Sequence, residues 1–244
     1  MNRQIVLVFF TLLATVVLFE YSHLDLAVQD YFYNFELSQW IINRDNALLK
    51  LFLYDGIKKL FIIFVLALSV ALILFRETSI MRRYRRGFII VLLSSITVPL
   101  SVGVLKAVTH IPCPKNIQQY GGSYPHITLF KHYPQNFQQS QNIQCYPAGH
   151  ASGGFALMSL FFLFKKRKHR IIALVSSITT GWVTGGYKML IGDHFLSHTL
   201  VTMLLAWLII LIITRMICFK QSTWQEVLTT LASDSRTETA KNYS

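Results

Sequence analysis

The sequence predicts an all-α integral membrane protein, a bundle of six transmembrane helices, on three observations. The composition is too apolar for an ordinary soluble domain, because 53% of the 244 residues are hydrophobic, 14% are charged and the mean hydropathy is +0.44. The apolar residues gather in segments near the length, about 20 residues, that crosses a bilayer as a helix. Basic residues gather in short clusters that flank these segments.

Six apolar segments carry this prediction, and a chain in lipid must satisfy its own backbone hydrogen bonds, which favours helices. They span about residues 4–19, 58–75, 88–105, 151–164, 171–190 and 199–218. The first lacks a persuasive small-x-small cleavage site, so we interpret it as a retained helix and not as a signal peptide. The domain organisation expected is an integral membrane domain, residues 1–218, followed by a polar cytoplasmic tail, residues 219–244, with a helix near Trp224–Leu231.

The basic residues also predict the orientation. One cluster, Arg76 to Arg86, follows the second segment, and another, Lys165 to Arg170, follows the fourth. Loops rich in Lys and Arg stay in the cytoplasm, so both termini are expected there too. The net charge of +12 is explained by this topology, and no nucleic-acid partner is expected. Residues 20–56 are polar and aromatic, which is typical of a helix or loop at the membrane surface.

The remaining polar residues concentrate on the outward side. Lys106 ends the third segment, residues 145–150 open the fourth, and the connection between the last two carries a further group: Lys188, Asp193, His194 and His198. Ionisable residues at the edges of spanning segments are costly, so they are candidates for function.

These residue types suit phosphoryl transfer. Lys106 and Lys188 can hold phosphate oxygens, while the N-terminus of the fourth helix offers free N–H groups to an anion. Gly149 allows the backbone to approach closely. The two histidines, His150 and His194, can divide the roles of nucleophile and general acid.

Three spaced motifs contain these residues: Lys106-AVTHIP-Cys113-Pro114, Pro147-Ala148-Gly149-His150 and Lys188-MLIGD-His194-FLS-His198. In order and spacing they resemble the motifs Lys-x6-Arg-Pro, Pro-Ser-Gly-His and Arg-x5-His-x3-Asp of the type 2 phosphatidic acid phosphatase superfamily. Three spaced motifs are far more specific than one.

The resemblance implies a membrane lipid phosphatase without a metal cofactor. His194 would attack phosphorus and form a phosphohistidine, His150 would protonate the leaving oxygen, and Lys106, Lys188, Gly149 and Ala148 would line the phosphate site. Substrates of this class are phosphomonoesters or diphosphates of amphiphilic lipids: lipid A, phosphatidate, phosphatidylglycerophosphate or undecaprenyl diphosphate. The amide-rich loop from Pro114 to Tyr146 would suit sugar hydroxyls and favours lipid A. The expected location is a bacterial inner membrane with the site facing the periplasm, and no obligatory protein partner is inferred.

Four positions depart from the family pattern: Cys113, Ala148, Lys188 and His198. Lysine at 188 keeps the charge of arginine but loses its bidentate fork. The change at 198 matters most, because the family's aspartate there orients the nucleophilic histidine. A neutral His198 could accept the same hydrogen bond, or Asp193 could substitute.

Cys113 and Cys145 lie in the same outward loop and are candidates for a disulfide in an oxidising compartment. The bond would close a loop of about 30 residues and contribute roughly 3 kcal/mol on chain-entropy grounds. Two unpaired thiols are the alternative, and Cys218, near the cytoplasmic side, is expected to stay reduced.

Other interpretations remain open. His194 and His198 are spaced as on one helix face and suit a zinc ion, although a third ligand is not evident. The same residues could transfer phosphate from an isoprenoid diphosphate to a lipid acceptor. A third possibility is a non-catalytic scaffold for lipid binding or transport. The pairs Gly153-Gly154 and Gly185-Gly186 are interpreted as points of close helix packing.

Overall fold

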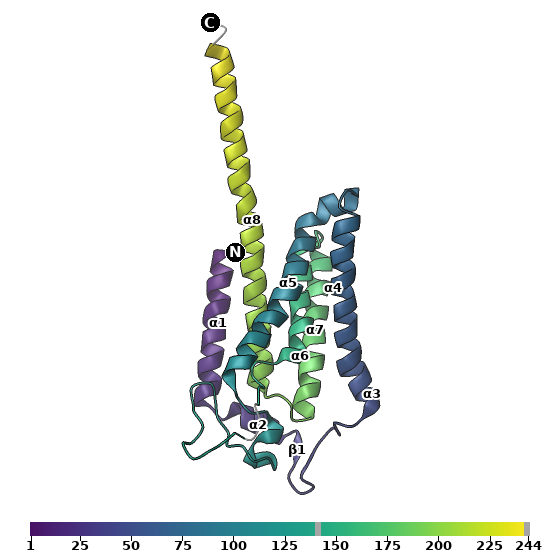
Figure 1. Cartoon of the computed structure of the whole chain (residues 1–244), viewed down its shortest axis with the longest axis vertical. Coiled ribbons are helices and arrows are strands. Elements are labelled where there is room, and N and C mark those ends of the chain that lie inside the picture. Colours follow the sequence, from purple (N-terminus) through teal and green to yellow (C-terminus); the bar gives the residue numbers. More distant parts are fainter. Residues whose placement is uncertain (140–142, 242–244) are drawn as a thin grey trace.

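Helices dominate the computed structural model, which describes residues 1–139 and 143–241, with the backbone alone for residue 54 and residues 219–241. The long helices run side by side as one bundle (Figure 1). They are α1 (Asn2–Tyr21), α4 (Ile57–Leu74), α5 (Ser79–Thr109), α7 (Arg167–Leu190) and α8 (Leu196–Lys241), with the short α6 (Gly149–Ala156) between them. The short α6 packs against α5, α7 and α8, and α1 packs against α8.

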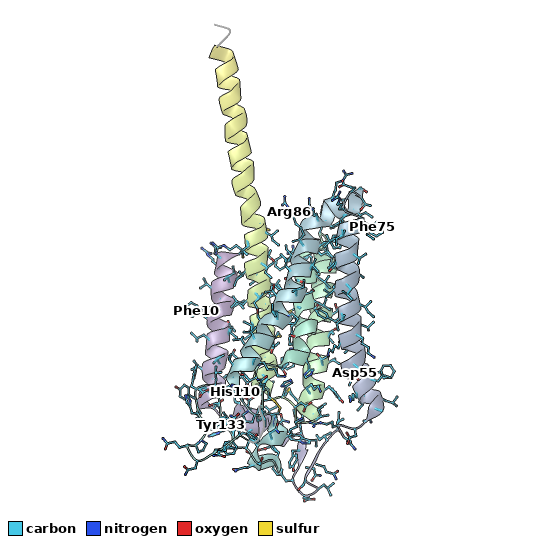
Figure 2. All side chains as sticks on the ribbon, viewed as in Figure 1. Phe10, Asp55, Phe75, Arg86, His110 and Tyr133 are labelled. Carbon is cyan, nitrogen blue, oxygen red and sulfur yellow. A yellow bond between two sulfur atoms is a disulfide. The ribbon has the colours of Figure 1, made fainter. Side chains whose placement is uncertain are left out.

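Four stretches in the described part of the chain are long and apolar enough to cross a membrane. They are Asn2–Tyr21, Ala47–Leu74, Ser79–Asn116 and Leu196–Cys218. Large apolar side chains cover their outer faces: Phe10 is 60% exposed and Leu66 61% exposed, and Phe10 points away from the bundle (Figure 2). Apolar surface on this scale suits contact with lipid. The fold is therefore an all-α bundle of an integral membrane protein.

The expected count of six spans is not confirmed, because two of the six segments do not meet the same standard of length and hydropathy. Residues 151–164 fold as the end of α6 followed by a 3₁₀ helix, η4 (Leu157–Phe162). The eight residues of α6 and six of η4 rise only about 24 Å together, less than the hydrocarbon thickness of about 30 Å. The other segment, residues 171–190, lies in α7, which is long enough but opens with basic residues and carries many Ser and Thr side chains.

Small residues bring α6 and α7 together at the centre of the bundle. A Cβ atom on Gly154 would lie 2.6 Å from the backbone nitrogen of Gly181, and one on Gly181 would lie 2.3 Å from the ring of Phe155. The surrounding core is fully buried and includes Val98, Ala151, Phe155, Ala206 and Ile210. The end of α6 that carries His150 is thereby held in a fixed position between α5 and α8.

A layer of short elements covers the end of the bundle opposite the N-terminus (Figure 1). It contains α2 (Leu24–Asp30), the antiparallel strands β1 (Tyr33–Asn34) and β2 (Gln39–Trp40), α3 (Ala47–Lys50), the π-helix η1 (Leu51–Gly56), and the 3₁₀ helices η2 (Pro114–Asn116) and η3 (Gln118–Tyr120). Tyr33 and Trp40 pack with Tyr120 and Phe195. The aromatic residues expected at the membrane surface thus join this layer to the start of α8.

At the other end, α8 continues as a helix past the expected end of the membrane domain at residue 218 to Lys241. It extends beyond the bundle on the side of the N-terminus (Figure 1). The helix expected near Trp224–Leu231 is therefore only part of a longer one. No Gly or Pro occurs between residues 219 and 241, so the sequence has no strong helix-stopping residue there.

Candidate functional site

Lys106 and the N-terminus of α6 form one wall of the site. Lys106 lies in the last turn of α5, and α6 begins at Gly149. A Cβ atom on Gly149 would lie 4.0 Å from Lys106 Nζ, so the ammonium lies beside the first turn of α6. An anion could therefore bind here, where it would meet free backbone N–H groups, the positive end of the helix dipole and the lysine charge.

Two histidines face each other at this wall. His150 Nδ1 and His194 Nε2 lie 3.3 Å apart, although His150 opens α6 and His194 lies in the turn between α7 and α8. His194 is 2% exposed. Burial, together with the charges of His198, His150, Lys106 and Lys188, lowers the pKa of His194 well below its ordinary value. The His194 ring is therefore neutral near pH 7 and keeps a lone pair.

Asp193 is the centre of an ion-pair cluster. Its carboxylate lies 3.0 Å from Lys188 Nζ, 2.8 Å from Lys115 Nζ and 2.5 Å from a guanidinium nitrogen of Arg44. Burial alone would raise the pKa of Asp193, but the hydrogen bond from Lys115 and the charge of Lys188 outweigh burial and hold this pKa below its ordinary value. Asp193 thus fixes three cations beside His194.

The ring of His198 packs against His194 with their centroids 5.7 Å apart, and against Tyr146 at 5.1 Å. Within the part of the chain that the structure describes, neither His194 Nδ1 nor His198 Nδ1 has a hydrogen-bond partner. The hydrogen bond to the nucleophile that the sequence suggested for His198 or Asp193 is therefore not formed in this conformation.

The loop between α5 and α6 is tied down on both sides of the site. Cys113 and Cys145 are joined in a disulfide, with their Cα atoms 5.3 Å apart and 32 positions apart in sequence. Nearby, Cys145 N–H donates to the carbonyl of Ile111 at 3.0 Å, and the Thr109 hydroxyl donates to the carbonyl of Tyr146 at 2.5 Å. These links connect the end of the Lys106 motif to the approach to His150. Cys218 is a free, exposed thiol.

A cavity of about 360 Å³, here called the inner cavity, opens between α4, α5 and α6. Its polar part consists of three basic side chains and two hydroxyl side chains: His150, Lys106, Lys58, Ser152 and Thr184. The rest is largely apolar, with Phe61, Ile62 and Pro99 in its wall. The inner cavity therefore suits a molecule with an apolar body and an anionic end at His150. Among the described residues, no three His, Cys, Asp or Glu side chains are grouped so as to hold a metal ion.

The model of the PAP2 superfamily matches residues 87–221, more than half of the chain. The chain belongs to the PAP2 superfamily. The match covers α6, α7, most of α5 and the start of α8, and it includes all three motifs. No curated protein and no solved structure matches the chain. Membership supports phosphatase-type activity on a phosphate ester.

Three residues at this PAP2 site, Asp25, Arg44 and Lys115, were not among those singled out from the sequence. Asp25 and Arg44 precede the matched segment and reach the site through the layer of short elements. Lys115 lies in the loop that follows the first motif. Its position directly after the Cys113-Pro114 pair is the one local signal that could have found it.

Proposed function

We propose that this PAP2-superfamily chain is a membrane lipid phosphatase that works through a phosphohistidine on His194. The observation that carries the proposal is the 3.3 Å approach of His150 and His194 beside Lys106 and the N-terminus of α6. Two imidazoles, a lysine and free N–H groups together supply a nucleophile, a proton donor and an anion site.

In the first step, Lys106, Lys188 and the N–H groups of α6 hold the nonbridging oxygens of the phosphate. Nε2 of His194 attacks phosphorus, the P–O bond to the lipid breaks, and protonated His150 gives its proton to the leaving oxygen. In the second step, neutral His150 takes a proton from water, which attacks phosphorus and breaks the P–N bond. In-line transfer places attacking and leaving atoms on opposite sides of phosphorus, so the two rings must move apart to admit the substrate.

The supporting roles follow from the contacts. Asp193 holds Lys188 at 3.0 Å and fixes its direction. Gly149 lies beside Lys106 at the start of α6, and Ala148 contributes backbone but no hydroxyl. His198 buttresses the nucleophile by ring contact.

The membrane placement is also a proposal. We infer six crossings, with α6–η4 enclosed by the other helices and α7 turning one face, with Ile171, Val175 and Val183, towards lipid. The backbone and hydroxyl groups of α6–η4 are then screened from lipid by protein. The turn between α4 and α5 lies at the same end of the bundle as the N-terminus (Figure 1), and its arginines favour the cytoplasmic side. The layer of short elements then faces the periplasm of a bacterial inner membrane.

The substrate proposed is an amphiphile whose phosphate lies at headgroup level. The apolar wall of the inner cavity suits an acyl or isoprenoid chain with its phosphate at His150. Lipid A, phosphatidate, phosphatidylglycerophosphate and undecaprenyl diphosphate all have this form.

The test is release of inorganic phosphate from these lipids by the full chain in detergent, with chelator present. The wild type is expected to release phosphate, and His194→Ala is expected to release none. The control is His169→Ala, which changes an exposed histidine at the other end of α7. Unchanged release by His194→Ala would reject His194 as nucleophile. Phosphate transfer that requires an added lipid acceptor would instead identify a phosphotransferase.

A further inference from the structure

A second cavity, of about 480 Å³ and here called the outer cavity, lies among the short elements beside Lys188. Four basic and two acidic residues line it: Arg44, Lys50, Lys115, Lys188, Asp45 and Asp193. The outer cavity and the inner cavity share no lining residue. It is therefore a separate space with an excess of positive charge.

The charge inside the outer cavity is only partly compensated. Lys188, Lys115 and Arg44 all pair with the single carboxylate of Asp193. Exposure of these side chains rises outward, from 10% for Lys188 to 31% for Lys115 and 46% for Arg44. Asp45 is the second carboxylate of the lining, which leaves four cations against two carboxylates. An incoming anion therefore meets favourable charge and two reachable donors.

The outer cavity is close to the reacting groups. Asp193 directly precedes His194, and Lys188 belongs both to the outer cavity and to the third motif. A neighbouring cavity of about 420 Å³ shares Arg44 and Lys115 and adds Trp40 and Asn43 to its lining. Together the two cavities offer cations, an aromatic face and an amide, a set that suits a polar headgroup carrying an anion.

We propose that the outer cavity binds a second phosphate of the same lipid molecule whose first phosphate is hydrolysed at His194. The preferred substrate is then an amphiphile with two phosphate groups. This inference rests on the proposed function and deepens it. Arg44 and Lys50 lie outside the segment that matches the family, so the preference belongs to this chain's own N-terminal part.

The experiment compares two lipids with the same chains, one carrying one phosphate and the other two. For the doubly phosphorylated lipid, Lys50→Gln is expected to lower kcat/KM about tenfold, mainly through KM, because one charge-assisted contact is lost. For the singly phosphorylated lipid the change is expected to stay within about twofold. Lys59→Gln, an exposed lysine on α4 that lines neither cavity, is the matched control and should change neither value.

Binding of both lipids to His194→Ala protein separates this proposal from the proposed function, since binding needs no turnover. The doubly phosphorylated lipid is expected to bind more tightly, and Lys50→Gln is expected to reduce that difference about tenfold. Equal binding of both lipids, or equal losses for both, would overturn the inference even if the enzyme is active. Inorganic phosphate or phosphatidylglycerol is also added at concentrations well below that of the substrate. If either one removes the preference for the doubly phosphorylated lipid, the outer cavity binds a free anion or a neighbouring lipid, and the inference is overturned.

Discussion

The carboxylate of Asp25 accepts two hydrogen bonds from Ser197, one from the backbone N–H at 2.8 Å and one from the hydroxyl at 2.5 Å. Asp25 comes from α2, whereas Ser197 lies in the first turn of α8, between His194 and His198. The carboxylate therefore caps α8 where the helix has free N–H groups and a positive dipole end. In this way an N-terminal element outside the family match fixes the turn that carries the nucleophile.

Asp25→Asn is expected to stabilise the protein more at pH 8 than at pH 5. Burial raises the pKa of Asp25 to about 6, although the hydrogen bonds from Ser197 lower it. A raised pKa means that the protonated form is favoured in the fold, so stability that is present below about pH 4 is lost as the pH rises to about 6. The loss is about 3 kcal/mol in total, and roughly half of it falls between pH 5 and 8. Asparagine keeps the shape without the charge.

The measurement is the thermal unfolding midpoint in detergent at both pH values. The wild-type midpoint should decrease from pH 5 to pH 8 when it is compared with that of the variant. If it does not decrease, the raised pKa of Asp25 is contradicted. Asp30→Asn, a substitution at the C-terminal end of the same helix, serves as the control.

The acid limb of the pH dependence of kcat/KM is expected to lie well below pH 6.5. Burial and the neighbouring His198, His150 and lysines lower the pKa of His194, so the neutral nucleophile persists as the pH falls. Because kcat/KM reports the free enzyme, a profile measured at low substrate concentration provides the check. An acid limb at or above pH 6.5 would show that His194 is protonated more easily than its burial implies.

His198→Asp is expected to raise kcat by about tenfold, because a carboxylate there could accept a hydrogen bond from His194 Nδ1 and stabilise the charged ring. In the wild type that nitrogen has no partner among the described residues, and the two rings meet only by contact. The same carboxylate would raise the pKa of His194, so the acid limb should move upward. His198→Asn, similar in size but uncharged, should not show the upward shift. A folded His198→Asp protein with unchanged kcat and pH profile would rule out this role.

The sequence could group residues of the candidate site that belong to local motifs, but not residues that meet from distant parts of the chain. Lys106, His150 and His194 could be grouped because each ends or opens an apolar segment on the same side. Asp25 could not be found, because its partner Ser197 is 172 positions away and no pattern links them. The sequence predicted the four membrane spans whose helices carry apolar residues on their outer faces. α6–η4 is too short, and α7 begins with basic residues and carries several Ser and Thr side chains, so neither matches the length and hydropathy of the other four stretches.

Replacing Cys113 and Cys145 together by Ser is expected to lower the free energy of unfolding by about 3 kcal/mol. The disulfide restrains the 32-position loop in the unfolded chain and links the Lys106 motif to the approach to His150. Thiol labelling of the denatured protein should find one free thiol, Cys218, before reduction and three after it. Equal labelling before and after reduction would show that the disulfide does not form.

Gly154→Ala is expected to destabilise the fold by about 2 kcal/mol or more, whereas Gly186→Ala is expected to be neutral or slightly stabilising. A Cβ atom on Gly154 would lie 2.6 Å from the backbone nitrogen of Gly181 and 2.7 Å from its Cα, and backbone cannot yield as a flexible side chain can. A Cβ atom on Gly186 would meet no atom within 4 Å, so only the helix preference for alanine remains. Because α6 carries His150, forcing α6 away from α7 should also displace His150 from its position beside His194 and Lys106 and lower kcat. Thermal unfolding midpoints and phosphate release from both variants provide the check. Equal effects of the two substitutions would show that α6 and α7 are not in backbone contact at Gly154.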